Sequence, residues 1–240
     1  PCPGACISAR TTGCIGGLPG NAVLEVTDLV CRRGGRTVLS GVGFTVPSGE
    51  AALVRGPNGA GKSTLLRVLA GLLGFQGGTL RLGDADLPGD PGIWQEQVAY
   101  GGHQDAVKPA LTVRGNLQAW ARILGGASVD AALDRFGLAG IADRPAVECS
   151  AGQKRRLGLA RLMLQDRPLW LLDEPTVSLD AETAEMVAGM VREHCAKGGT
   201  ALVASHVPMD LGPGPVVEIA SDFGGRPATK EDPFLSGDWA

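Results

Sequence analysis

The sequence predicts an α/β fold with a β-rich opening, a parallel core sheet and an inserted α-helical subdomain. Short alternating apolar runs between Val23 and Val46, each ended by Gly, Pro or Asp, indicate strands. Apolar residues at helical spacing from about Leu111 to Leu164 indicate the helical insertion. The continuous apolar runs 169–172 and 200–204 are typical of parallel strands that are buried on both faces.

Composition limits the size of the core and the kind of partner. The chain has 240 residues, of which 44% are hydrophobic and 20% charged, enough for one α/β domain with an inserted subdomain. The formal net charge is -3, so no basic excess draws the chain to nucleic acid, and we expect no nucleic-acid partner. The longest apolar stretches fall short of the roughly 20 residues that cross a bilayer, so we expect any membrane contact to be peripheral.

The two ends of the chain differ in composition from its middle. We expect residues 1–21 to be a flexible extension and residues 22–220 to form the core domain, with a helical subdomain at about 104–164. Residues 221–240 show no hydrophobic periodicity and are expected to form a tail. The six cysteines include no CxxC pair, which favours free thiols. A metal site at Cys2, Cys6 and Cys14 is the less favoured alternative, because no histidine accompanies them.

A glycine-rich loop follows the apolar run Ala51–Arg55 and precedes apolar residues at helical spacing from Leu65 to Leu73. Its residues are Gly56, Pro57, Asn58, Gly59, Ala60, Gly61, Lys62, Ser63 and Thr64. The pattern GxxxxGK[ST] between a strand and a helix is typical of P-loop NTPases. We expect the whole loop to bind a nucleotide, because its backbone N–H groups and the helix N-terminus attract phosphate. Lys62 adds a charge on the β- and γ-phosphates, and the Ser63 hydroxyl is a candidate Mg²⁺ ligand.

Two acidic residues and a histidine follow predicted core strands. Asp173 and Glu174 come directly after the apolar run 169–172, at the carboxyl end of a strand, where ligands gather in parallel sheets. We expect Asp173 to hold Mg²⁺ and Glu174 to polarise the water that attacks the γ-phosphate. His206 follows the run 200–204, and we expect it near the γ-phosphate as the third catalytic residue beside Glu174 and Lys62.

With this loop and Asp-Glu pair on the chain, the stretch Ser150-Ala-Gly-Gln153 resembles the signature motif of ABC ATPase nucleotide-binding domains. The resemblance covers residues 22 to about 220. It implies ATP and Mg²⁺ as cofactors and a dimer of two copies that sandwich two ATP molecules, each signature contacting the nucleotide on the partner's loop. A serine hydroxyl and a glycine N–H at a helix start fit an anion. We therefore expect Ser150, Gly152 and Gln153 to contact the nucleotide.

The same resemblance assigns further positions. Ser178-Leu-Asp180 resembles the D-loop, so Asp180 is expected at the nucleotide across the dimer. The Mg²⁺-ligating switch-loop residue, usually glutamine, falls at His103 or Gln104: gapless spacing favours His103, and ligand chemistry favours Gln104. Arg33 stands where the family has the aromatic residue that stacks on adenine, and a guanidinium plane can also stack on a purine.

Two features of the signature region depart from a simple motif match. Cys149 precedes Ser150 where the family has leucine, a loss of apolar packing that should be tolerated. Lys154, Arg155 and Arg156 follow directly, and we expect them to be charges on an exposed helix face or to assist the phosphate electrostatically.

Three stretches, 102–112, 150–161 and 232–239, resemble the ATP-binding subunits of cytochrome c maturation transporters, also called haem exporters. This resemblance implies a bacterial complex at the cytoplasmic face of the inner membrane, with membrane-spanning transporter subunits as partners and no direct haem ligation by this chain. The alternatives are a soluble ABC-type ATPase acting on ribosomes or DNA, and the ATPase subunit of an ABC exporter with another substrate. A P-loop kinase is disfavoured by the signature and the Asp-Glu pair.

Overall fold

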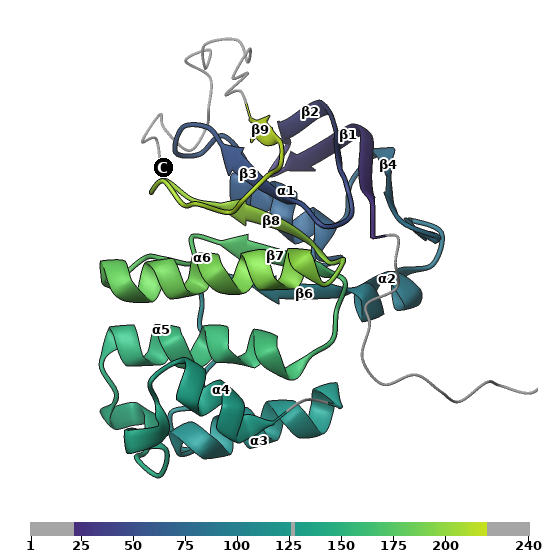
Figure 1. Cartoon of the computed structure of the whole chain (residues 1–240). Coiled ribbons are helices and arrows are strands. Elements are labelled where there is room, and N and C mark those ends of the chain that lie inside the picture. The colour runs from purple at the N-terminus through teal and green to yellow at the C-terminus, as the bar shows by residue number, and fades with distance from the viewer. Residues whose placement is uncertain (1–21, 126–127, 220–240) are drawn as a thin grey trace, which may run out of the picture.

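The computed structural model describes residues 22–125 and 128–219 (Figure 1). The expected extension 1–21, the expected tail 221–240 and the alternative metal site at Cys2–Cys14 lie outside the described residues. Three cysteines of the described part are free thiols, as the spacing predicted: Cys31, Cys149 and Cys195.

The chain opens with an antiparallel sheet of strand order β2-β1-β4-β5. Its strands are β1 (Leu24–Arg33), β2 (Arg36–Val46), β4 (Gly77–Leu82) and β5 (Ala85–Leu87). The two short pieces at 38–39 and 41–46 that the alternation indicated are one strand. The break between them is a shift in the β1–β2 register, where Gly41 takes a φ of 63°.

The core sheet is parallel, with strand order β6-β7-β8-β3-β9. Its strands are β3 (Ala51–Arg55), β6 (Val98–Gly101), β7 (Leu169–Asp173), β8 (Thr200–Ala204) and β9 (Val216–Glu218). Every residue of β7 and β8 is buried, which confirms the prediction from their continuous apolar sequences.

Alternate residues of the core strands face two separate hydrophobic clusters. Helix α6 (Ala181–Ala196) and the helical part pack on one face, against Leu53, Trp170, Leu172, Ala201 and Val203. Helix α1 (Lys62–Leu69) and the antiparallel sheet pack on the other face, against Ala52, Val54, Leu171, Leu202 and Ala204. Each fully buried leucine stabilises the fold by roughly 1.5–3 kcal/mol. The parallel sheet that carries the site is therefore packed on both of its faces.

The helical part lies at the opposite end of the molecule from the antiparallel sheet (Figure 1). It contains α3 (Val113–Leu124), α4 (Val129–Arg135) and α5 (Ala151–Ala160), with 3₁₀ turns at Ala139–Ile141, Ala146–Glu148 and Arg161–Leu164. A hydroxyl group caps the N-terminus of each helix: Thr112, Ser128 and Ser150. Across the described ranges, no helix combines the length and apolar character needed to cross a membrane.

Helix α1 is shorter than the apolar spacing indicated. It ends at Leu69 instead of continuing to Leu73, because Gly71 takes a left-handed φ of 67° and turns the chain. Leu72, which the spacing placed on the buried face, is 64% exposed. The connection from here to β6 includes α2 (Pro91–Gln97), capped by the Asp90 carboxylate.

Candidate active site

The glycine loop lies between β3 and α1 and packs closely against β2 and against the residue that follows β9. A side chain at Gly56 would collide with the carbonyl oxygen of Ile219, and its φ of 148° disfavours any residue with a Cβ. Gly61 has a φ of 106°, and a Cβ there would lie 3.0 Å from both Val38 and Leu39 of β2. Neighbouring strands thus force the loop into one curled path.

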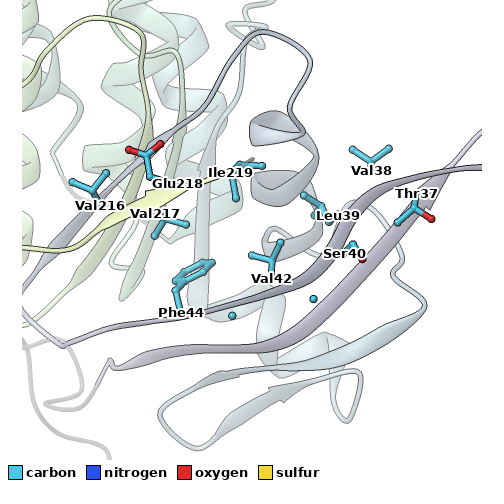
Figure 2. Close-up of a pocket in the computed structure, with 12 residues that line it drawn as sticks. Thr37, Val38, Leu39, Ser40, Val42, Phe44, Val216, Val217, Glu218 and Ile219 are labelled. Carbon is cyan, nitrogen blue, oxygen red and sulfur yellow. The ribbon is translucent and has the colours of Figure 1, made fainter. Parts of the chain in front are cut away.

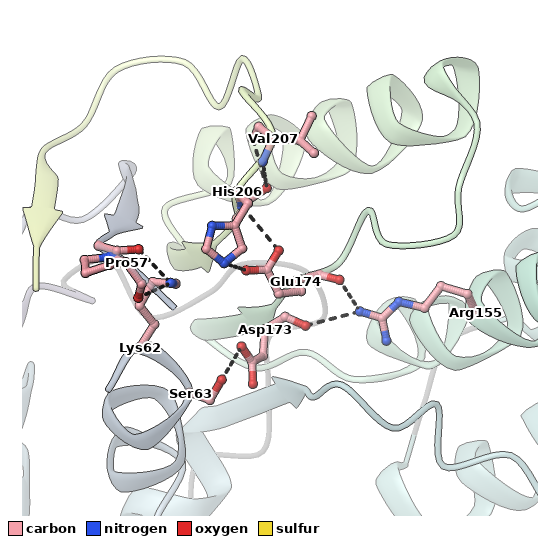
Figure 3. A network of polar contacts seen from close by, with 10 residues as sticks. Pro57, Lys62, Ser63, Arg155, Asp173, Glu174, His206 and Val207 are labelled. Carbon is pink, nitrogen blue, oxygen red and sulfur yellow. Dashed lines mark hydrogen bonds and ion pairs between the residues drawn. The ribbon is translucent and has the colours of Figure 1, made fainter. Parts of the chain in front are cut away.

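The ammonium group of Lys62 is held inside the curl of the loop. Its Nζ donates hydrogen bonds to the carbonyl oxygens of Gly56 at 2.8 Å and Pro57 at 3.1 Å, and the residue is only 7% exposed (Figure 3). No carboxylate within 22–125 and 128–219 pairs with it. The charge of Lys62 is therefore available to an anion at the mouth of the loop.

The first turn of α1 adds backbone donors to the same place. Its N-cap is Gly61, which supplies no side-chain cap, so the N–H groups at the helix start are not taken by a side chain. Pro57, Asn58 and Gly59 are exposed at the loop tip. Ala60 differs, because its methyl group is buried and its N–H donates to the Pro57 carbonyl. Thr64 is buried within the helix.

The adjacent carboxylates of Asp173 and Glu174 serve different partners (Figure 3). Asp173 Oδ1 accepts a hydrogen bond from Ser63 Oγ at 3.0 Å, which joins the end of β7 to the loop helix. Glu174 takes a left-handed φ of 50°, and its carboxylate pairs instead with His206. The distance from Glu174 Oε1 to His206 Nε2 is 3.2 Å, and the His206 backbone N–H donates to Oε2 at 3.3 Å.

His206 lies beside the loop, at the carboxyl end of β8. A hollow of about 300 Å³ is lined by Arg55, Gly56 and the segment Ser205–Pro208. Lys62, Glu174 and His206 therefore gather at one edge of the parallel sheet, where β3, β7 and β8 end. The Glu174 side chain is 18% exposed, so water can reach it.

The signature stretch forms a self-contained helix cap. Ser150 Oγ accepts from the Gln153 N–H at 3.2 Å, and Gln153 Oε1 accepts from the Ser150 N–H at 2.9 Å, a capping box at the start of α5. Among the described residues, no hydrogen bond or ion pair joins this stretch to the chain's own glycine loop. The signature therefore does not complete the site of the loop on its own chain.

The D-loop segment packs directly against the signature. A Cβ on Gly152 would lie 3.2 Å from the carbonyl oxygen of Ser178, whose φ is 65°. Asp180 is the N-cap of α6, and its carboxylate accepts from the Thr183 N–H at 2.7 Å. Hydrogen bonds from Thr183 lower the pKa of Asp180 below its ordinary value. Asp180 is thus a helix cap within its own chain.

Three expected site residues stand apart from this cluster. Arg33 ends β1 opposite Arg36, with its side chain exposed. His103 and Gln104 follow β6 and are both exposed, and no hydrogen bond joins either side chain to Ser63 or Asp173 among the described residues. Both stay candidates for the switch-loop position.

Arg155 is buried, whereas the sequence indicated a charge on a helix face or a residue that assists the phosphate. The residue is only 5% exposed, and its guanidinium group donates to carbonyl oxygens at the end of β7, those of Asp173 and Glu174 among them. The residues on either side of it, Lys154 and Arg156, are half-buried. The spacing from Arg155 to the buried Leu159 and Leu162 is i, i+4, i+7, so helical periodicity could have found it.

Tyr100 is a further site residue that the sequence reading missed. Its hydroxyl lies 3.5 Å from Asp173 Oδ2, on the strand that pairs with β7, and burial raises the pKa of the phenol. The available signal was the chain's single tyrosine at the end of a short strand.

A second hollow, of about 350 Å³, lies between β2 and β9 (Figure 2). Its lining is Thr37–Phe44 and Val216–Ile219, among which Glu218 is the single charged residue. Val38 and Leu39 reach both this hollow and Gly61 of the loop.

A phosphate loop, carboxylates at the end of the core strand β7 and a capped signature helix together define an ATP-binding cassette. The family model for ABC transporters matches residues 39–177. A cytochrome c biogenesis ATP-binding export protein, CcmA, from Ruegeria pomeroyi is 49% identical over 210 residues, which cover 88% of this chain and 97% of that protein. The protein of the same name from Paracoccus denitrificans is 47% identical over 82% of this chain and 89% of that one.

Two solved structures share the fold. One, described as an ATP binding subunit of an ABC transporter, aligns with a TM-score of 0.70 and 28% identity over 77% of this chain and 80% of that one. The other, the dimeric ATP-binding cassette MJ0796 bound to ADP and Pi, aligns with a TM-score of 0.68 and 22% identity over 77% of this chain and 88% of that one. This second likeness shows the fold alone. The chain belongs to the ABC transporter family and, within it, to the cytochrome c biogenesis ATP-binding export proteins.

Proposed function

We propose that this chain is the ATP-hydrolysing subunit of a bacterial ABC transporter that serves cytochrome c biogenesis. The observation that carries the proposal is the arrangement in Figure 3, where the Ser63–Asp173 hydrogen bond and the Glu174–His206 pair lie beside Lys62. The pathway is supported by the relatives, whose names describe ATP-binding export proteins of cytochrome c biogenesis.

ATP binding is proposed to depend on charge and backbone dipoles at the loop. The first-turn N–H groups of α1 attract the phosphates, and Lys62 exchanges its two carbonyl partners for phosphate oxygens. Arg33 is proposed to stack on the purine ring, since its guanidinium group is exposed.

Mg²⁺ fits the oxygen donors at the end of β7. The Ser63 hydroxyl and the Asp173 carboxylate are hard oxygen ligands of the kind Mg²⁺ prefers, and they already contact each other. A bound Mg²⁺ ion would neutralise charge on the phosphate oxygens. Gln104, or His103 in its place, is proposed as a further ligand from the switch loop.

Hydrolysis is proposed to use Glu174 as the base that takes a proton from the attacking water. His206 orients this carboxylate through both its ring and its backbone N–H, and the ring faces the hollow beside Gly56. His206 thus stands between the base and the place where the γ-phosphate is expected.

A second copy of the chain is proposed to complete each site. Ser150, Gly152 and Gln153 have no link to the loop of their own chain among the described residues, while Ser150 and Gly152 offer a hydroxyl and an N–H at a helix start. In a two-fold dimer, each signature would face the nucleotide on the partner's loop. Asp180 and the neighbouring D-loop segment would lie at the same interface, because Ser178 contacts Gly152.

The proposed location is the cytoplasmic face of the inner membrane, bound to membrane-spanning transporter subunits of the cytochrome c maturation system. Haem is proposed to be handled by those partners, since the three histidines have other surroundings. His194 is buried and stacks on Trp170, His206 pairs with Glu174, and His103 is exposed without a second histidine beside it.

The test is an affinity purification of the tagged chain from detergent-solubilised membranes, with an ATPase assay on what is recovered. Recovery of a multi-spanning cytochrome c maturation subunit with ATPase activity supports the proposal. Recovery with ribosomes or nucleic acid from the soluble fraction would contradict the transporter assignment, and an unrelated membrane partner would contradict the pathway.

A further inference from the structure

Arg155 is the buried cation of helix α5, two residues after the signature ends. It is 5% exposed, although a guanidinium group is almost never fully buried unless it is paired. Its five N–H groups must then find partners inside the protein.

Each N–H of Arg155 finds an acceptor. The acceptors are the carbonyl oxygens of Asp173 (3.2 Å), Glu174 (2.7 Å), Pro175 (3.2 Å) and Gly102 (2.9 Å), and the carboxylate of Asp105 (3.0 Å). The side chain therefore has no hydrogen-bonding capacity left over. Figure 3 shows the guanidinium group reaching from α5 toward the carbonyl groups behind Asp173 and Glu174.

These acceptors come from two segments that the reaction is proposed to use. One is the turn 173–175, which carries Asp173 and Glu174. The other is 102–105, where Gly102 and Asp105 bracket the switch-loop candidates His103 and Gln104. A single side chain thus fixes the backbone behind the proposed base and both ends of the switch dipeptide.

Glu174 is the acceptor most dependent on this contact. Its left-handed φ of 50° is unfavourable for a residue with a side chain, and the surroundings must hold it there. The shortest of the five hydrogen bonds, from Arg155 Nη2 to the Glu174 carbonyl at 2.7 Å, acts on that residue. Without Arg155 this carbonyl would keep only the longer hydrogen bond from the Val177 N–H, at 3.4 Å, so the peptide could rotate and carry the carboxylate away from His206.

Close packing joins the segment 102–105 to α5 independently of the hydrogen bonds. A Cβ on Gly158, one turn beyond Arg155, would lie 2.7 Å from the Asp105 carbonyl oxygen. The Asp105 backbone thus lies directly on the helix while its carboxylate pairs with Arg155. The segment and α5 are expected to move as one body.

We propose that Arg155 is a positioning residue that ties the signature helix to the catalytic carboxylate Glu174 and to the switch dipeptide. When a nucleotide engages the first turn of α5, the displacement passes through Arg155 to both segments. The roles of Glu174 and the switch loop in this inference rest on the proposed function, whereas the hydrogen bonds that join Arg155 to the two segments do not depend on it.

The test compares Arg155→Lys with Arg156→Lys, the same change one position along the helix. Arg156 makes one hydrogen bond, to the Phe136 carbonyl, and donates to neither segment among the described residues. Hydrogen exchange of the purified chain is measured at two amides of the turn. The Glu174 N–H donates to the Ala204 carbonyl, and the Val177 N–H donates to the Glu174 carbonyl. The Leu65 amide in α1 reports on the rest of the core, and steady-state ATP hydrolysis is measured on the same samples.

We expect Arg155→Lys to raise exchange at the two turn amides about tenfold or more while Leu65 exchange changes less than about twofold. The kcat for ATP should fall about 10- to 100-fold with KM unchanged, and Arg156→Lys should resemble wild type in both measurements. Unchanged exchange at the turn, or a uniform rise that includes Leu65, would overturn the inference. If the wild-type chain has no ATPase activity but Arg155→Lys still raises exchange at the turn, the proposed function would be contradicted. The positioning role of Arg155 would still be supported.

Discussion

Helices α1 and α5 both begin at residues proposed to contact phosphate, yet their first turns are satisfied differently. The N-cap of α1 is a left-handed glycine, Gly61, with no side-chain cap, and Lys62 beside it carries a positive charge with no ion-pair partner in the described part of the chain. The N-cap of α5 is Ser150, which exchanges two hydrogen bonds with Gln153, and its first turn contains no acidic residue.

The difference indicates which terminus can bind an anion by itself. The start of α1 has free donors and a cation, so it is ready for phosphate before any partner arrives. The start of α5 is stable alone, because its cap is internally satisfied, and a ligand must compete with that cap. We infer that α1 determines affinity, whereas α5 responds to a nucleotide that a second chain brings.

The largest effect is expected from Glu174→Gln, which leaves both helix starts intact. Loss of the base should lower kcat by about 10²–10⁴ while ATP affinity is kept, because the loop contacts remain. Retained phosphate contacts should also trap an ATP-bound dimer, visible as a larger species in size-exclusion chromatography with ATP. Glu182→Gln, an exposed carboxylate in the first turn of α6, is the matched control. Normal turnover by the Glu174 variant would refute the role of this residue.

Lys62→Ala tests the α1 side of the comparison directly. Removing the positive charge of Lys62 should weaken ATP binding and lower hydrolysis by about 10²–10³. Equilibrium binding of ATP measures the first effect, and phosphate release measures the second. Lys197→Ala removes an exposed lysine after α6 and should change neither. If the two variants bind ATP equally well, α1 does not determine affinity.

Low pH should lower the stability of the folded chain through His194. The two helix starts can therefore be compared only at a pH where the chain stays folded. Burial against Trp170 lowers the pKa of this imidazole from 6.5 to about 4. The unfolded chain then binds the proton first, so stability is complete above pH 6.5 and falls as the pH drops toward 4. The loss should reach about 2 kcal/mol at pH 5 and about 3 kcal/mol below pH 4.

Urea unfolding at pH 7.5 and pH 5 measures this loss. His194→Phe keeps an aromatic ring on Trp170 without a titrating group, so its stability should fall less between the two pH values. His103→Gln removes an exposed histidine and should keep the wild-type dependence. Equal losses in wild type and His194→Phe would show that His194 is not the source.

The smallest effect is expected from Ser150→Ala, which tests the α5 side. Loss of the cap should destabilise the chain by about 1 kcal/mol. Ser128→Ala removes a cap of the same type from α4 and should cost a similar amount. The two variants should differ in ATP hydrolysis, which only Ser150→Ala should lower. An equal effect of both variants on hydrolysis would mean that Ser150 acts through stability alone.

The parts of the site that sequence could predict are those encoded by consecutive residues. The loop 56–64 and the strands β7 and β8 are local patterns, and the structure places them as expected. Arg155 was misread, because its acceptors lie 18 to 53 positions away in sequence and appear only when β6, β7 and α5 meet.

The strands between α1 and β6 were not predicted from the sequence, and the reason again lies in distant pairing. β5 has three residues and β6 four, too few to show a period. β4 owes its place to pairing with β1, which lies about 60 positions earlier at Leu24, opposite Leu82. The early end of α1 likewise depended on one glycine, Gly71, within an apolar run.

The most direct test of the composite site mixes Lys62→Ala chains with Ser150→Arg chains. Each variant alone should be inactive, because every site would contain either a defective loop or a blocked signature. In a one-to-one mixture, half of the dimers pair the two variants and regain one intact site, so activity should return to about a quarter of wild type. A mixture as inactive as its components would contradict a site shared between two copies of the chain.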